Sequence, residues 1–363
     1  MADIILGKED LRAMSKAFTG ARIAVAGAGA IGSVIGGSLT QAGVDVWFVD
    51  PWLDHVRALQ AHGLFLQDPD TTSSIRVKAL HISEADTLRD IDILLVCVKS
   101  YDTASTVSLL KPCLRPGAFA VSCQNGINED TIASILGAPF TLGCVIHFGA
   151  TLMGPGHAKR LRRGGRFIVG ELDGKVTERV KSLALLLSSC TETIITDNLM
   201  GHRWVKLAYN CTGNPLLALT GYTVRELHAQ EKATPLIRAI ILELIQVAEA
   251  CGHRLEPIHG IPTEIWKTDI FKGVDAIEVA FREHAGVLGD RRSSMVYDLD
   301  QGRPMETDSL NGYVARKGED VGVATPVNRA IAEMLYNLEQ GRVQPHPTTL
   351  VPLLALVEQS YRK

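Results

Sequence analysis

RIAVAGAGAIGSVIGGSLTQAGVDVWFVD, residues Arg22–Asp50, is the stretch that decides the fold. It begins with a short apolar run, Ile23–Ala26, of the kind expected for a buried parallel strand. Glycines then recur in the spacing G-x-G-x-x-G at the start of a small-residue segment suited to a helix, and a second apolar run, Val44–Val49, ends in Asp50. Strand, glycine turn, helix, strand and acidic residue in this order predict a dinucleotide-binding βαβ unit.

The glycine turn indicates which residues would contact the cofactor. The first glycine allows a tight turn, the second lets a pyrophosphate approach the backbone, and the third lets the helix pack closely on the strand. The phosphates are then expected at the helix N-terminus, where backbone N–H groups and the helix dipole favour anions. The cofactor-binding residues predicted from this turn are Gly27, Gly29, Ala30, Ile31 and Gly32.

Asp50 bears on the kind of dinucleotide. A carboxylate at this position accepts hydrogen bonds from the ribose hydroxyls and would repel a 2′-phosphate. The sequence therefore favours NAD(H) over NADP(H). The alternative is that Asp50 only caps the following turn, because Asp before Pro51 is also a common turn opener.

Composition narrows the classes of partner. The 363-residue chain is long enough for two domains, and its formal net charge of −3 gives no broad attraction to nucleic acid or to an anionic membrane. A basic run at Lys159–Arg166 has no interleaved aromatic residues and indicates a solvated loop. A transmembrane helix over Ile23–Val44, with the motif Gly32-x-x-x-Gly36, is disfavoured by the many glycines and polar residues of that segment. We expect neither nucleic acid nor membrane as a partner.

The cysteines and the N-terminus indicate the compartment. Seven cysteines are dispersed without any C-x-x-C pair, which is typical of reduced thiols in a cytoplasmic protein. No His, Cys and carboxylate cluster has the spacing of a zinc site, so no metal is expected. Residues 1–20 lack the basic start and apolar core of a signal peptide and predict a short surface extension.

Strands and helices alternate through the rest of the first half. The expected elements are a helix over Leu53–His62, an extended segment over Ser74–Leu80, strands at Asp92–Val98 and Ala118–Cys123, short extended pieces from Leu142 to Glu171, a helix over Val176–Ser189 and a strand at Thr193–Thr196. This alternation predicts an α/β fold, a Rossmann-type doubly wound parallel sheet forming a dinucleotide-binding domain over residues 1–197. Ligands gather at the carboxyl ends of such strands, where Lys99 and Asn125 fall beside the glycine turn. We expect both beside the cofactor or substrate.

Residues 198–363 are predicted to form an all-helical domain for the substrate and for dimerisation. The expected helices are Leu199–Asn214, Thr234–Cys251, Pro262–Lys272 and a pair from Ser294 onward. The second helix of that pair is expected to begin with Thr325 as its N-cap and Pro326 as its first helical residue. The tail Arg342–Lys363 contains three prolines and is expected to be an appendage.

Lys206, Asn210 and Asn214 are spaced four residues apart and so share one helix face. Asparagine is a poor helix-interior residue, so this alignment indicates a site. Pro215 is expected to disturb the helix just after Asn214. A lysine in a cleft can protonate the alkoxide formed when a hydride reaches a carbonyl carbon, and burial would lower its pKa toward the working pH. The alternative is a solvated polar stripe.

Ser294 and Glu306 bracket the turn Gly302-Arg303-Pro304. Ser294 is expected to cap its helix and to offer a hydroxyl to a substrate carboxylate. Spacing alone does not separate this role from capping only, or a site role of Glu306 from that of a surface carboxylate.

These motifs together resemble the ketopantoate reductase (2-dehydropantoate 2-reductase) family. The matching segments are GAGAIG at Gly27–Gly32, VKSYDT at Val98–Thr103, QNG at Gln124–Gly126, RWVKLAYNCTGNPL at Arg203–Leu216, SSM at Ser293–Met295, GRPMETDSLNG at Gly302–Gly312 and GVATPVN at Gly322–Asn328. The resemblance covers most of the chain except its two ends. It implies a dinucleotide-binding domain joined to a helical domain, with the active site in the cleft between them.

The resemblance also implies a role for each matching residue. Lys206 would be the general acid on the substrate carbonyl, and Asn125 and Asn210 would orient Lys206 and the substrate. Asn214 would lie nearby. Ser294 would hold the substrate carboxylate, Glu306 would bond the substrate hydroxyl, and Lys99 would lie by the cofactor.

Three positions depart from the family pattern. Asp50 stands where NADPH-using members generally carry a basic or neutral residue. Val224 and Arg291 stand where many members carry asparagine, and Arg292 follows. Fewer polar groups for a hydroxyl and more cations suggest a substrate other than ketopantoate, with Arg291 contacting a second anionic group.

The expected function is hydride transfer between a nicotinamide cofactor and a 2-oxo acid/2-hydroxy acid pair, either ketopantoate/pantoate or a related acid. One alternative is an NAD-dependent catabolic 2-hydroxy acid dehydrogenase with a more anionic substrate. The other is a dinucleotide-binding sensor without catalysis. A cytoplasmic homodimer associating through the helical domain is expected.

Overall fold

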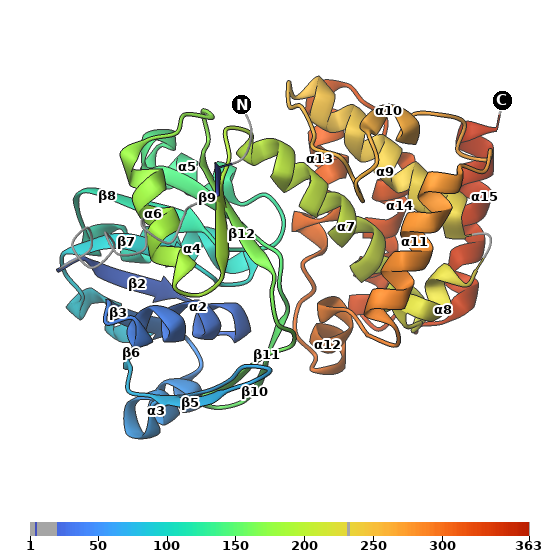
Figure 1. Cartoon of the computed structure of the whole chain (residues 1–363). Coiled ribbons are helices and arrows are strands. Elements are labelled where there is room, and N and C mark those ends of the chain that lie inside the picture. Colours follow the sequence, from blue (N-terminus) through green and yellow to red (C-terminus); the bar gives the residue numbers. More distant parts are fainter. Residues whose placement is uncertain (1–3, 6–19, 231–232, 363) are drawn as a thin grey trace. The chain divides into compact units, whose positions relative to one another are not determined.

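The computed structural model describes residues 4–5, 20–230 and 233–362. The chain divides into two compact units, Met1–Leu199 and Met200–Lys363 (Figure 1). Within the described ranges, no helix is both long enough and apolar enough to cross a membrane.

A nine-stranded sheet forms the centre of the first unit, in the order β1-β13-β12-β9-β8-β7-β2-β3-β6. The strands are β1 (Ile4–Ile5), β2 (Arg22–Ala26), β3 (Asp45–Asp50), β6 (Lys78–His81), β7 (Ile91–Val96), β8 (Leu114–Ser122), β9 (Thr141–Ile146), β12 (Arg166–Glu171) and β13 (Glu192–Ile195). From β6 to β9 all neighbours pair in parallel, and β12 is antiparallel to β9. This order is that of the doubly wound dinucleotide fold, so the predicted fold class is confirmed.

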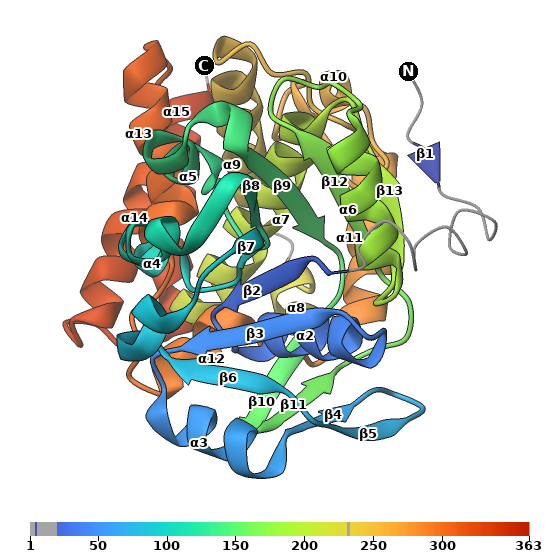
Figure 2. The same cartoon turned by 90° about the vertical axis from the view of Figure 1, so that its left-hand side faces the viewer.

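Helices cover both faces of the sheet, because each central strand is apolar on both sides. On β2, Ile23 and Val25 join one buried cluster, while Ala24 and Ala26 join the other. The first cluster includes residues of α2 (Ala30–Gln41) and α6 (Glu178–Ser188); the second includes residues of α4 (Thr103–Leu110) and α5 (Glu129–Leu136). Figure 2 shows these two pairs of helices on opposite sides of the strands.

A second sheet of four strands has the order β10-β11-β4-β5. Its strands are β4 (Leu64–Gln67), β5 (Thr72–Ile75), β10 (Ala150–Gly154) and β11 (His157–Arg160). The segment Ser74–Leu80, predicted as one extended piece, is divided between two sheets: β5 pairs with β4, and β6 pairs with β3. The prediction missed this division because the change of sheet depends on the pairing of β6 with β3, which lies far from the segment in sequence, whereas β4 lies just before β5. Helix α3 (Leu53–His62) has the predicted bounds.

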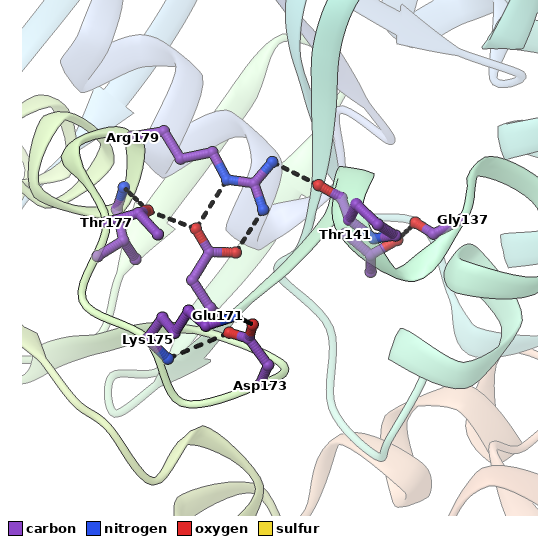
Figure 3. Close-up of polar contacts among 9 residues, drawn as sticks. Gly137, Thr141, Glu171, Asp173, Lys175, Thr177 and Arg179 are labelled. Atoms are coloured by element: carbon purple, nitrogen blue, oxygen red, sulfur yellow. Dashed lines mark hydrogen bonds and ion pairs between the residues drawn. The ribbon is translucent and has the colours of Figure 1, made fainter.

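A buried ion pair fixes the end of β12 (Figure 3). Glu171 is 3% exposed and accepts hydrogen bonds from Arg179 Nε at 2.7 Å and from the Thr177 hydroxyl. The Arg179 guanidinium also donates to the carbonyl of Pro139. Because Thr177 caps α6, this cluster ties the start of that helix to the sheet.

The described part of the N-terminal extension lies at the surface, as predicted, since Ile4 is 43% exposed, and it also pairs with the edge of the sheet. Ile4 and Ile5 form β1, which pairs antiparallel with Ile195 and Ile194 of β13. Residues 6–19, which the sequence placed on the surface, lie outside the described residues.

The second unit is helical, as predicted. Its helices are α7 (Leu199–Thr220, whose first residue belongs to the first unit), α8 (Val224–His228), α9 (Ala233–Ala250), α10 (Thr263–Trp266), α11 (Asp275–Leu288), α12 (Ser294–Asp300), α13 (Asn311–Val321), α14 (Pro326–Glu339) and α15 (Leu350–Tyr361). The predicted helix Pro262–Lys272 is wrong beyond Trp266. The carbonyls of Ile270 and Lys272 accept hydrogen bonds from the buried Arg238 guanidinium, with N···O distances of 3.1 and 2.6 Å, in place of the backbone hydrogen bonds of a helix.

Of two predictions at the C-terminal end, one is confirmed and one is wrong. Thr325 is the N-cap residue of α14 and Pro326 is its first helical residue, as predicted. The Thr325 side chain makes no capping hydrogen bond; the buried Glu243 carboxylate accepts from the backbone N–H groups of Val327 and Asn328 at 2.8 and 2.9 Å. The tail is not an appendage, because α15 buries Leu350, Leu353 and Val357 against the helical unit.

Candidate active site

The turn between β2 and α2 has the shape that a dinucleotide pyrophosphate requires. Gly27 has φ +93°, and a Cβ atom there would lie 2.7 Å from the backbone nitrogen of Val98. A Cβ on Gly32 would lie 1.9 Å from the carbonyl oxygen of Gly27, so only glycine lets the helix approach the turn. A Cβ on Gly29 would meet nothing within 4 Å, which leaves open space at the N-cap of α2. The residues present therefore fit the dinucleotide implied by the family, with its phosphates at this helix start.

Asp50 is held firmly at the end of β3. It is 9% exposed; Oδ2 accepts from the backbone N–H of Ala28 at 2.7 Å, and Oδ1 accepts from that of Trp52 at 2.8 Å. The second bond is the turn cap considered from the sequence. The first joins the carboxylate to the glycine turn, and a carboxylate has about four acceptor positions, so two stay available for ribose hydroxyls.

Lys99 and Asn125 follow the neighbouring strands β7 and β8, at the carboxyl edge that also carries the glycine turn. A polar network that the sequence did not predict fixes these two loops. Gln124 Nε2 donates to the carbonyl of Val98 at 2.9 Å, and Asn128 Nδ2 donates to the carbonyl of Asn125 at 2.8 Å. The QNG motif could have indicated this network, because an amide side chain can donate and accept hydrogen bonds and so bridge two loops at one sheet edge.

Lys206 lies on α7 in the second unit and is partly buried. Burial, followed by the positive charge of Arg203, lowers the pKa of Lys206 to about 8. A lysine with this pKa can both donate and accept a proton near neutral pH. The sequence analysis missed Arg203, although it stands three residues before Lys206 and so on the same helix face.

Asn210 and Asn214 follow one and two turns later on α7. Asn210 is 8% exposed, and its Nδ2 is buried without an acceptor among the described residues. A fully solvated stripe does not have this property. A buried amide donor without an acceptor is costly, and a ligand oxygen would satisfy it.

Helix α7 does not end at Asn214; it continues to Thr220 with Pro215 inside it. Proline has no N–H, so the carbonyl of Cys211 lacks its usual partner four residues on. Asn311 Nδ2 takes that place, donating to the Cys211 carbonyl at 3.2 Å. This hydrogen bond joins the motif at Gly302–Gly312 to α7, the helix that carries Lys206.

Ser293, and not Ser294 as predicted, is the N-cap of α12. Its hydroxyl accepts from the N–H of Val296 at 3.4 Å and donates to the carbonyl of Asn214 at 3.3 Å. Ser294 is therefore the first helical residue and is exposed, and its hydroxyl is not used as the cap. This places the start of α12 beside Asn214. Glu306 is partly exposed, immediately before the short turn Thr307–Ser309.

Two of the three positions that depart from the family pattern are neighbours in space. The N–H of Val224 donates to the carbonyl of Arg291 at 3.1 Å. Arg292 instead pairs with Asp300 at 2.7 Å. The two departures thus modify one small region of the helical unit, and Arg292 is engaged elsewhere.

Models of known families match both units. Residues 23–174 match "Ketopantoate reductase PanE/ApbA", and residues 198–339 match its C-terminal model. Among curated relatives, a 2-dehydropantoate 2-reductase of Mesorhizobium japonicum is 32% identical over 204 residues, 56% of each chain. One of Archaeoglobus fulgidus is 30% identical over 226 residues, 61% of this chain and 68% of the relative.

Solved structures give the same result. A PanE/ApbA family ketopantoate reductase of Ralstonia eutropha matches with a TM-score of 0.76 and 30% identity, over 88% of this chain and 99% of that one. D-mandelate dehydrogenase with NADH and anilino(oxo)acetate matches with a TM-score of 0.77 and 25% identity, over 88% and 99%. The predicted function, an oxidoreductase acting on the CH–OH of a 2-hydroxy acid with a nicotinamide cofactor, agrees with these findings. With both of its units matched in chain order, the chain belongs to the ketopantoate reductase family.

Proposed function

We propose that the chain is an NAD(H)-preferring reductase of a 2-oxo acid, with Lys206 as the proton donor in reduction and the proton acceptor in oxidation. The observation that carries this proposal is the pairing, on one face of α7, of a lysine whose pKa is lowered to about 8 with the buried amide donor of Asn210.

The chain's own residues would act as follows. The glycine turn, Asp50 and Lys99 would bind the cofactor, and Asn125 would orient the substrate and Lys206. The reduced nicotinamide, when bound, supplies the hydride to the carbonyl carbon. Lys206 Nζ would donate its proton to the carbonyl oxygen, so that the C=O bond becomes C–OH.

The helical unit would bind the rest of the acid. Asn210 would donate to the carbonyl oxygen, and Asn214 would lie beside it. The exposed hydroxyl of Ser294, at the start of α12, would donate to the carboxylate, where helix N–H groups also favour an anion. Glu306 would accept from a substrate hydroxyl.

Substrate choice is the part of the proposal that departs from the family pattern. Val224 and Arg291 lie side by side where many members carry asparagine, which favours an acid with fewer hydroxyls and a second anionic or aromatic group. The fold match with D-mandelate dehydrogenase supports a 2-hydroxy acid dehydrogenase as the second candidate. In this second candidate function, the chain would oxidise a 2-hydroxy acid to the 2-oxo acid.

A spectrophotometric screen tests the function. NADH and NADPH are crossed with ketopantoate and with branched, aromatic and dicarboxylic 2-oxo acids, and the 2-hydroxy acids are run with NAD and NADP. Rapid turnover of ketopantoate would assign the protein to pantothenate synthesis and make Arg291 incidental. Turnover of another acid with ketopantoate inert would support the second candidate. Binding of NADH without turnover of any acid would favour the sensor.

Asp50→Ser tests the cofactor preference. Removing the carboxylate removes both the acceptor for the ribose hydroxyls and the repulsion of a 2′-phosphate. We expect the ratio of kcat/KM for NADH over NADPH to fall by about 10-fold or more, equivalent to about 1.4 kcal/mol. An unchanged ratio would mean that Asp50 serves only as the turn cap.

The assembly and compartment belong to the same proposal. We infer a cytoplasmic homodimer that associates through the helical unit. The seven free cysteines support a reducing compartment. Sedimentation of the full chain at micromolar concentration tests the assembly, and a monomer would contradict it.

A further inference from the structure

The helical unit contains a cavity apart from the residues proposed for the active site. Its volume is about 630 Å³, and α8, the start of α9, α11 and the loop 270–274 form its walls. These three helices lie together in Figure 1. None of its described lining residues belongs to α7 or α12 or is among the residues proposed for catalysis. The volume lies within the range of about 300–1,000 Å³ typical of small-molecule sites.

The cavity is cationic. Arg225, Arg238, Lys272 and Arg282 line it, and Glu278 is the one acidic residue among the described lining residues. Arg225 pairs with Asp290 at 3.0 Å, which compensates its charge. Lys272 and Arg282 form no ion pair with any described residue and are exposed at the cavity. Their charges are therefore available to an anion.

Arg238 adds a buried donor. It is 1% exposed, and its Nη atoms bond to the carbonyls of Ile270 and Lys272 and to Thr268. Its Nε–H has no acceptor among the described residues. Burial lowers the pKa of Arg238, and the negative charge of Asp269 acts in the opposite direction. A buried cation is costly, and a second anion in the adjoining cavity would lower that cost further.

The remaining wall is apolar. Phe281 and Ile277 of α11 are 5% and 1% exposed, and Ile270, Phe271 and Pro235 also line the cavity. Such a wall binds the apolar or aromatic part of a ligand, while the cations fix its charged end.

We infer that this cavity is a binding site for a small organic anion, a carboxylate or phosphate monoester with an apolar body, that is separate from the catalytic site. Lys272 and Arg282 would hold the anionic group, the buried charge of Arg238 would add to the positive potential of the cavity, and Phe281 and Ile277 would pack against the apolar part. The inference does not depend on the identity of the substrate.

Calorimetric titration of the full chain without cofactor tests the site. The probes are 4-phenylbutyrate and phenyl phosphate. Two control compounds are titrated in the same way: 4-phenylbutan-1-ol, which lacks the negative charge, and inorganic phosphate, which lacks the apolar group. We expect both phenyl anions to bind with a Kd below 1 mM and each control compound to bind at least about 10-fold more weakly, because each lacks one half of the recognition. Equal binding of the neutral alcohol would overturn the role of the cations.

Variants locate the binding. Lys272→Gln with Arg282→Gln should weaken both phenyl anions at least about 10-fold. The matched control, Arg329→Gln with Arg342→Gln, removes two exposed charges of the same unit outside the cavity and should leave Kd unchanged. Equal affinity of the first pair and wild type would overturn the inference.

Two further measurements separate this site from the catalytic one and from a change in folding. Lys206→Ala should bind the phenyl anions as wild type does, and saturating NADH should not displace them; loss of binding in either case would place the ligand at the active site instead. In the wild type, 4-phenylbutyrate should slow hydrogen exchange at residues 268–282. Unchanged exchange there would contradict the site even if the double variant failed to fold.

Discussion

The lowered pKa of Lys206 affects both the stability of the folded chain and the proton transfer proposed for this residue. Burial and Arg203 lower its pKa to about 8, so the folded state disfavours the charged form that the unfolded chain carries up to about pH 10.5. The resulting destabilisation is fully present below about pH 8 and disappears as the pH rises from 8 to 10.5. An ordinary exposed lysine would be more favourable for folding, which supports the proposed role of Lys206 in the reaction.

Lys206→Met should therefore stabilise the fold while abolishing turnover. We expect kcat/KM to fall by about 10²–10⁴, the usual contribution of a general acid. The free energy of unfolding at pH 7 should rise by about 1–3 kcal/mol, with the gain shrinking toward pH 10. Denaturant titrations at both pH values measure this gain. Lys181→Met, at a more exposed position on α6, should show no gain, and a destabilised Lys206→Met would contradict the assignment.

Helix α7 depends on a partner from another helix. Pro215 deprives the Cys211 carbonyl of its helical donor, and Asn311 Nδ2 supplies one while also donating to Asn328 Oδ1 at 2.9 Å. The long helix that carries Lys206 and Asn210 is thereby continuous through a proline. Without this donor, a buried carbonyl next to the proposed site would have no partner.

Asn311→Leu should cost about 2–3 kcal/mol in the free energy of unfolding, because it leaves buried polar groups without partners. Pro215→Ala restores the backbone N–H to the Cys211 carbonyl. In that background the cost of Asn311→Leu should be smaller by about 1 kcal/mol. Unfolding of the two single variants and the double variant gives this coupling energy, and strict additivity would mean that the two groups act independently.

In the helical unit, the chain's C-terminal end contributes to a buried polar centre. Glu243 is 0% exposed and accepts from Val327 N, Asn328 N, Asn328 Nδ2 and the Tyr361 hydroxyl. Burial raises the pKa of Glu243 despite these four donors. The carboxylate thus joins α9, α14 and α15, which are distant in sequence.

Tyr361→Phe removes one donor from this buried carboxylate. We expect the free energy of unfolding at pH 7 to fall by about 1–2 kcal/mol, since a hydrogen bond to a buried carboxyl group is lost. Tyr297→Phe, at a side chain that is 51% exposed, is the matched control and should change little. Equal effects of the two substitutions would mean that α15 is held by apolar packing alone.

Local signals made much of the fold predictable. The βαβ unit around Gly27, the helix Leu53–His62 and the face shared by Lys206 and Asn210 each depend on residues a few positions apart. Predictions failed where the deciding partner is distant. Asn214 and Ser293, which share a hydrogen bond, are 79 positions apart in the sequence. Glu243 and Val327, whose N–H donates to Glu243 at the start of α14, are 84 positions apart.

The sequence by itself determined the fold class, the family and the helix that carries the proposed catalytic lysine, because strand alternation, glycine spacing and helical periodicity are written within short segments. Only the tertiary structure decided which groups complete those segments: Asn311 beside Pro215, Ser293 as the cap of α12, and Arg238 at its cavity. The physical reason is that buried polar groups must find partners wherever packing brings them, and packing joins residues that sequence distance does not relate.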